Sequence, residues 1–165
     1  MMNIISGHNS KVSNATKPLS TTKPCNCLKK NPCPLSGECL STNVVYQATV
    51  NQTQTDIEEN YVGLTADPFK LRFGNHKKSF KHENYSSEST LSSYIWKLKS
   101  ENINYNISWK IIDRGKSFSP ITNICQLCTK EKFHIIFHPE LSSLNSRNEL
   151  FSSCRHKMKL LLKNI

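Results

Sequence analysis

Residues 105–111 carry the clearest pattern in the chain, because Tyr, Ile, Trp and Ile alternate there with Asn, Ser and Lys. A period of two is typical of a strand with one buried face. Residues 44–50 read VVYQATV, and their β-branched side chains favour another strand. Residues 61–65 predict a further short strand, and the residues between these two segments are polar. We therefore expect the first two strands to form a hairpin.

Four segments are predicted to be helical. The pair Asp67-Pro68 suits a helix start, with Asp as the N-cap and Pro at the first helical position. A second helix is predicted through about residue 100, with Ser89 or Thr90 as its cap. A third ends near His138-Pro139 and a fourth covers about 146–163. The expected order is strand, strand, helix, helix, strand, helix, helix.

Composition divides the chain of 165 residues into three parts. Residues 1–24 are rich in Ser, Thr, Asn and Lys and are expected to be a disordered linker. Residues 25–42 form a Cys-rich segment, and residues 43–165 are expected to form one compact domain, for which 36% hydrophobic residues suffice. The N-terminus lacks the pattern of a signal peptide, so we expect an intracellular protein.

The charge of the chain is strongly positive, with 22 Lys+Arg against 12 Asp+Glu and a formal net charge of +10. This excess favours a polyanionic partner. Nucleic acid and an anionic membrane surface both fit the sign. No apolar run approaches the ~20 residues that cross a bilayer.

Seven cysteines lie in two groups on either side of the predicted strands. In a reducing compartment, clustered cysteines are more often zinc ligands than disulfides. The second group needs two further ligands, which are either Cys154 and His156 or His134 and His138. The alternatives to zinc sites are buried unliganded cysteines and a disulfide-linked secreted protein. The candidate thiolate ligands are Cys25, Cys27, Cys33 and Cys39 in the first group and Cys125 and Cys128 in the second.

Three charged or titratable residues between Cys39 and Cys154 suit phosphodiester hydrolysis. Glu131 lies in a predicted helix between Lys130 and Lys132, and a carboxylate there can hold a hard divalent cation. Arg72 can grip a phosphate, and His76, one turn later on the same helix face, can position or activate water. Taken singly, each also has an ordinary interpretation as a solvated surface residue.

Two tyrosines, a glycine and an amide extend this set. Tyr46 and Tyr61 lie in predicted strands, where packing explains a tyrosine as well as catalysis does. Gly63 in a strand indicates close approach of another group. Asn145 could cap the last helix.

The order of these residues resembles that of the GIY-YIG endonuclease family. The two elements of the family's name read Val44-Val45-Tyr46 and Tyr61-Val62-Gly63 here, and the Arg-His pair, the glutamate and the asparagine follow in order. Eight blocks are similar to the endonuclease domain that follows the reverse transcriptase in Penelope-like retroelements. They read CNCLKKNPCPLSGEC, YVGLT, FKLRFGNH, SSYIWKLK, ISWKII, CQLCTKEKFHII, LNSRNEL and SSCRHKMKLLL.

The resemblance implies an α+β fold, a small three-stranded antiparallel sheet flanked by helices and preceded by a Cys-rich zinc-binding knot. It implies that Glu131 binds one Mg²⁺ or Mn²⁺ ion and that Arg72 contacts the phosphate. Tyr46 would act in activating the water, with Tyr61 and His76 assisting.

Two further assignments follow from the same resemblance. The conserved amide of the family maps to Asn145, although Asn148 lies close to it in the sequence. The Cys-Arg-His string of the last block favours Cys154 and His156 as the ligands that complete the second zinc site.

The expected function is therefore metal-dependent nicking of target DNA for retroelement insertion, in the nucleus. DNA is the expected partner, no membrane is involved, and in the parent element a reverse transcriptase lies on the same chain. Because no reverse transcriptase core precedes residue 25, the chain is expected to be the detached end of such an element. The alternative is a non-catalytic, zinc-stabilised module that binds nucleic acid.

Overall fold

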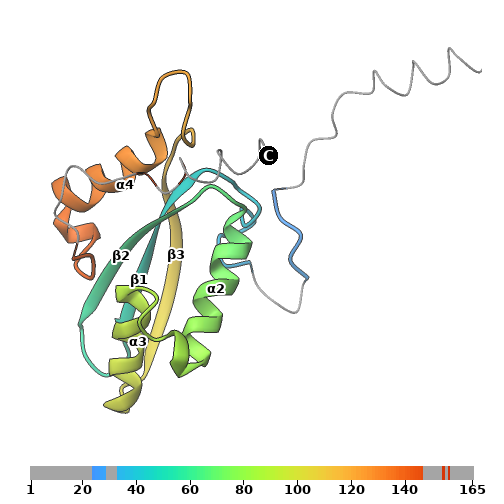
Figure 1. Ribbon diagram of the computed structural model, residues 1–165. Helices are drawn as coiled ribbons and strands as arrows, with labels where there is room; N and C mark the ends of the chain where they lie inside the picture. Colours follow the sequence, from blue (N-terminus) through green and yellow to red (C-terminus); the bar gives the residue numbers. More distant parts are fainter. Residues whose placement is uncertain (1–23, 29–32, 147–153, 155, 157–165) are drawn as a thin grey trace, which may run out of the picture.

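The computed structural model describes residues 24–28, 33–146, 154 and 156. The predicted linker over 1–24 and the predicted helix over 146–163 lie almost entirely outside these residues, as does Asn148. The described elements are β1 (Val44–Gln52), β2 (Glu58–Thr65), α2 (Phe69–Lys81), η1 (Glu83–Tyr85), α3 (Thr90–Ser100), β3 (Tyr105–Arg114), α4 (Gln126–Phe137) and η2 (Pro139–Leu141) (Figure 1).

The three strands form one antiparallel sheet in the order β2-β1-β3, which confirms the expected α+β fold. β1 and β2 form the predicted hairpin, in which Tyr46 lies opposite Gly63. On the other side of β1 the register to β3 shifts between Val45 and Tyr46, which pair with Asp113 and Ile111. This β-bulge turns the end of β3 locally, as an extra residue in one strand does.

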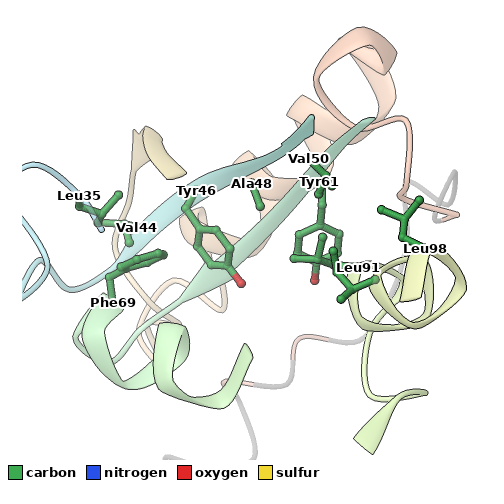
Figure 2. Close-up of a cluster of buried hydrophobic side chains, with 10 residues drawn as sticks. Leu35, Val44, Tyr46, Ala48, Val50, Tyr61, Phe69, Leu91 and Leu98 are labelled. Carbon is green, nitrogen blue, oxygen red and sulfur yellow. The ribbon is translucent and has the colours of Figure 1, made fainter. Parts of the chain in front are cut away.

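Alternation along the strands divides the core into two layers. Tyr46, Ala48 and Tyr61 face α2 and α3 and pack there with Phe69 and the apolar face of α3 (Figure 2). On the opposite face, α4 covers the sheet. The cluster there contains Val45, Val62, Cys125, Leu127 and Ile135.

The starts of two helices differ in how they are capped. Ser89 caps α3 as predicted, because its side chain accepts a hydrogen bond from the Ser92 backbone N–H. α2 begins at Phe69, with Pro68 as its N-cap residue and no side-chain cap, so the predicted role of Asp67 as the N-cap is wrong. Among the described residues, no helix has the length and apolar character needed to cross a membrane.

Candidate active site and cysteine clusters

The hydroxyl of Tyr46 is the centre of the candidate site. The ring of Tyr46 is fully buried, and its Oη lies 2.8 Å from Nε2 of His76. The Arg72 Nε–H donates to the same oxygen across 3.0 Å. The Tyr61 ring lies 6.5 Å from that of Tyr46, and its hydroxyl points to the same side of the sheet (Figure 2). The structure thus brings these four predicted residues together.

α2 presents Arg72 and His76 to the tyrosines because residues four apart lie on one helix face. Phe69, three residues before Arg72 in α2, is fully buried. Its ring packs edge-on against that of Tyr46, with 5.1 Å between the ring centroids. Trp109 of β3 packs against His76 at 5.3 Å between ring centroids. The alternating pattern of residues 105–111 predicted the inward position of this tryptophan, but not its contact with the histidine.

Gly63 makes room for both tyrosine rings. A Cβ atom at this position would lie 2.6 Å from Oη of Tyr46 and 2.9 Å from Cε1 of Tyr61. Cβ atoms essentially never come within 3.0 Å of a heavy atom outside their own residue and its chain neighbours. The close approach that the sequence indicated is therefore made by the rings of Tyr46 and Tyr61.

Burial and the neighbouring cation keep His76 neutral. Burial, followed by the charge of Arg72, lowers the pKa of His76 to about 3. Burial also raises the pKa of Tyr46, with a further contribution from Tyr61, while Arg72 acts in the opposite direction. A neutral imidazole can accept at Nε2, so the Tyr46 hydroxyl can donate to His76 while it accepts from Arg72. This arrangement provides a path for the phenolic proton.

Arg72 is a half-buried cation whose charge is held by phenols rather than by a carboxylate. Burial alone would lower its pKa, but Tyr46 and Tyr61 outweigh burial and raise it. No ion pair within 4.0 Å joins Arg72 to a carboxylate of a described residue. A guanidinium in this setting attracts an anion such as a phosphate.

Glu131 approaches from the other layer of the fold. It lies midway between Leu127 and Ile135 on the helix face that packs on the sheet, and both of these neighbours are buried. Among the three strands, α4 packs most extensively against β2, one of the two edge strands. The Glu131 carboxylate is close enough to contribute to the raised pKa of Tyr46. The predicted carboxylate is therefore half-buried and acts electrostatically on the candidate site.

A cluster of charged side chains that the sequence did not predict links α4 to the end of β3. Lys130 Nζ lies 2.6 Å from Oδ1 of Asp113, and His134 Nε2 lies 3.3 Å from Oδ2 of the same carboxylate. Asp113 belongs to the bulged end of β3, so only the register shift makes this contact possible. The only sequence signal was the spacing of Lys130 and His134, one turn apart on a helix.

Asn145 occupies a different position from the four converging residues. Its Oδ1 accepts from the Val62 N–H and its Nδ2 donates to the Val62 carbonyl, each across 2.8 Å. Val62 lies between Tyr61 and Gly63 in β2. Asn145 thus pairs with the outer edge of β2 as a neighbouring strand would, and it holds the two residues whose rings and gap form the site.

A small polar cavity of about 10 Å³ adjoins the site, which is room for about one water molecule. Beside Arg72 and His76 it is lined by polar residues that sequence reasoning missed. The Ser79 hydroxyl donates to the His76 carbonyl across 2.9 Å and lies 2.6 Å from Oγ of Ser92. Ser79 and Ser92 are buried, and serines carry no sequence signal for such a position. The other lining residues are Asn75, Glu88 and Ser89.

The first cysteine cluster has the geometry of a metal site. The Sγ atoms of Cys25, Cys27, Cys33 and Cys39 lie within 4.8 Å of one another. Two of these separations, Cys27 to Cys39 and Cys39 to Cys25, are 3.5 Å. Four sulfurs around Zn²⁺ at ~2.3 Å are about 3.8 Å apart, whereas a disulfide requires about 2.05 Å. All seven cysteines are free, so this cluster could bind a metal such as zinc.

Backbone donors favour the thiolate of Cys33 in this cluster, whereas burial raises the pKa of the Cys39 thiol. The Cys27 N–H donates to Sγ of Cys25 across 3.3 Å. Burial opposes ionisation of Cys33, but backbone N–H groups of Gly37 and Leu35 outweigh burial and lower the pKa of its thiol to about 6. Thiolates are the form that coordinates a metal ion.

The second cluster contains both of the favoured partners, Cys154 and His156. Nδ1 of His156 lies 3.3 Å from Sγ of Cys125 and 3.4 Å from Sγ of Cys128. Sγ of Cys154 lies 3.4 Å from Sγ of Cys128, and all four ligand atoms are within 4.8 Å of one another. This cluster could also bind a metal such as zinc.

The rival histidines of the second cluster have other partners. His134 pairs with Asp113, and His138 Nδ1 lies 3.2 Å from a carboxylate oxygen of Glu140. Neither histidine belongs to the group of ligand atoms around Cys125. The ligand set suggested by the Cys-Arg-His string is therefore the one that the geometry supports.

Comparison of the chain with protein-family models, with curated proteins and with solved structures finds no match. The residues of the site and their chemistry are therefore the basis for a functional interpretation.

Proposed function

We propose that the protein is a metal-dependent DNA endonuclease of the GIY-YIG type, similar to the endonuclease domain of Penelope-like retroelements. One observation carries the proposal: a fully buried phenol, Tyr46, has its hydroxyl bonded to a neutral imidazole and to a half-buried guanidinium. A hydrophobic core has no need of such a group, because phenylalanine would fill the same space without polar atoms. The arrangement is suited to moving a proton beside a bound anion.

The anion that best matches these groups is a phosphodiester. Arg72 would hold a non-bridging oxygen through guanidinium N–H groups, which suit phosphate geometry. As the Tyr46 hydroxyl passes its proton to Nε2 of His76, its Oη would take a proton from the attacking water. The resulting hydroxide would form the new P–O bond while the bond to the leaving oxygen breaks, and the leaving oxygen would take a proton from solvent. Burial and, as the second cause, the charge of Arg72 lower the pKa of His76 to about 3. A phosphate at Arg72 would raise the proton affinity of the imidazole.

A hard divalent ion such as Mg²⁺ or Mn²⁺ fits the donor set at this position. Mg²⁺ is commonly bound by one or two carboxylates together with waters and substrate oxygens. Glu131 supplies such a carboxylate, held on the sheet-facing side of α4 between two buried aliphatic residues. When bound, the ion would neutralise charge on the phosphate and on the leaving oxygen.

The cysteine clusters and the surface charge complete the proposal. Zn²⁺ in the two clusters would be structural, because each cluster offers four protein ligands and so would leave no position open. The net charge of +10 would give salt-dependent affinity for the DNA backbone without sequence preference. In a parent retroelement this domain would nick target DNA in the nucleus, next to a reverse transcriptase on the same chain.

The test is nicking of supercoiled plasmid in Mg²⁺ or Mn²⁺ by the parent chain, Glu131→Gln and a matched control, Glu83→Gln. Glu83 is exposed in η1, so its loss should leave cleavage unchanged. We expect Glu131→Gln to lose cleavage by about 100-fold or more, the usual order for a group that stabilises the transition state. Equal rates for Glu131→Gln and the parent would refute the proposal.

One outcome would favour the non-catalytic module. If the parent chain does not cleave, yet binds DNA with an affinity that falls steeply with salt, the protein binds nucleic acid without hydrolysing it. Binding at low and high salt is therefore measured in the same samples.

A further inference from the structure

The two helices that carry the proposed site residues both begin at a cysteine cluster. α2 carries Arg72 and His76, and α4 carries Glu131. Neither helix has a side-chain hydrogen bond at its N-cap, whereas α3, which carries none of the proposed site residues, has the ordinary serine cap. The first cluster is near the start of α2, and the second is at the start of α4.

At α2, the first cluster supplies the missing acceptors. The backbone N–H groups of the first two helical residues, Phe69 and Lys70, donate to the carbonyls of Ser41 and Cys39 across 2.9 and 2.7 Å. Cys39 is itself a candidate ligand and is fully buried. The Lys70 side chain donates to Oδ1 of Asn26, which lies between the first two cysteines, across 2.7 Å. The start of α2 is thus bonded to both ends of the cluster.

At α4, the second cluster is part of the helix start. Cys125 is the N-cap residue, and Cys128 lies in the first turn. The Cys125 carbonyl accepts from the backbone N–H and the hydroxyl of Thr129, across 3.1 and 3.0 Å, as an N-cap carbonyl ordinarily does, while the Leu127 N–H donates to the carbonyl of Lys116 across 3.0 Å. Any shift of the two cysteines would therefore move the first turn of the helix with them.

Helix ends make this coupling physically effective. The first four N–H groups of a helix lack partners within it and carry partial positive charge. A zinc ion held by four thiolates has a net charge of −2, and one held by three thiolates and a neutral histidine has a net charge of −1. Such a group is favoured beside the positive end of a helix. It also fixes the backbone of its ligands, and hence the carbonyls that α2 uses.

We propose that the metal-filled cysteine clusters act as the N-terminal caps of the two helices, each independently of the other. Metal in the first cluster holds α2, and with it Arg72 and His76, against the tyrosines. Metal in the second holds α4 and Glu131. The proposal rests on the proposed function for the importance of these helices, but the capping itself can be tested without DNA.

The experiment compares Cys25→Ser in the first cluster with Cys154→Ser in the second, in zinc-loaded protein. Hydrogen exchange is followed at the amides of Phe69 and Lys70 and at those of the first turn of α4. We expect Cys25→Ser to speed exchange at Phe69 and Lys70 by about tenfold or more while leaving α4 unchanged, because local opening follows the loss of a cap. Cys154→Ser should do the reverse. Changes of equal size at both helices in each variant would overturn the proposal.

A second measurement covers variants that fail to fold. The parent chain is titrated with a chelator while metal release, amide exchange and the ¹⁹F signal of 5-fluorotryptophan at Trp109 are recorded together. Trp109 packs against Phe69 and His76 at 5.7 and 5.3 Å, so it reports the position of α2. We expect the signal to shift before global unfolding. A shift that occurs only with global unfolding would contradict the proposal, whatever the outcome of the cleavage test.

Discussion

Replacing Gly63 by alanine should damage both stability and cleavage, because the added methyl group enters the space of the Tyr46 hydroxyl. The new Cβ would lie 2.6 Å from Oη and 2.7 Å from Cζ of Tyr46, and 2.9 Å from the ring of Tyr61. Ordinary van der Waals contact begins at 3.4 Å, so both rings would have to move by several tenths of an ångström. The two Tyr46 atoms, Oη and Cζ, belong to one rigid ring system, so they must move together.

The surroundings of Tyr46 leave little room for such a movement. Its ring is fully buried, with Phe69 at 5.1 Å and Trp109 at 5.9 Å between centroids, and its hydroxyl is bonded to His76 and Arg72. Overpacking of this kind costs about 1–3 kcal/mol of unfolding free energy. A displacement of about 1 Å at a reacting group can lower the rate about 100-fold.

Two measurements are made on each variant. Urea unfolding gives the free energy of unfolding, and plasmid nicking is measured separately under conditions in which the variant is folded. Gly74→Ala is the matched control, because Gly74 lies in the exposed interior of α2 with nothing within 4 Å of its added Cβ. This control should gain about 0.5–1 kcal/mol of stability and cleave like the parent. A Gly63→Ala protein as stable and as active as the parent would refute the packing described for Tyr46.

Three further predictions concern stability. The pKa of His76 is lowered to about 3 in the folded protein, so as the pH falls the unfolded chain takes up a proton at this residue first. The free energy of unfolding should therefore decrease between pH 6.5 and 3, by at most about 5 kcal/mol from this residue. Urea unfolding should show a smaller decrease over that range for His76→Gln. Asn145→Asp leaves the Val62 carbonyl without its donor and should cost about 1–3 kcal/mol, whereas an unchanged melting temperature would contradict the edge-pairing role. A zinc chelator should lower the melting temperature, and an unchanged curve would count against metal in the clusters.

The arrangement of strands and helices could be predicted because it depends on local periodicity. The period of two over 105–111 and the β-branched residues 44–50 identified β3 and β1, and both are confirmed. The start of α2 was misassigned, since Asp67-Pro68 has the composition of a cap and the actual acceptors are the carbonyls of Cys39 and Ser41. Backbone carbonyls have no sequence signature, so no pattern could have revealed them.

The convergence of the candidate site was accessible only in part. The spacing of Arg72 and His76 predicted that both lie on one helix face. Only the resemblance to a known family predicted that they would lie close to Tyr46. The contacts of Asn145 join residues separated by 83 positions in the sequence. Its pairing with Val62 depends on the outer edge of β2 being open, which only the strand order determines. The contacts of Asp113 with Lys130 and His134 likewise depend on the register shift between β1 and β3.

The position of β2 at an edge of the sheet would let residues from both layers act together in the proposed site. α2 and α4 cover opposite faces, and a sheet interior would separate Arg72 from Glu131 by a full layer of backbone. At an edge, side chains from the two faces can approach each other around the last strand. Gly63 leaves that last strand without a side chain beneath the Tyr46 hydroxyl, and Asn145 satisfies the polar groups of the neighbouring peptide, so the edge is closed to pairing with another strand. The proposed function therefore predicts that DNA approaches the molecule along β2, with one phosphate between Arg72 on one face and the carboxylate of Glu131 on the other.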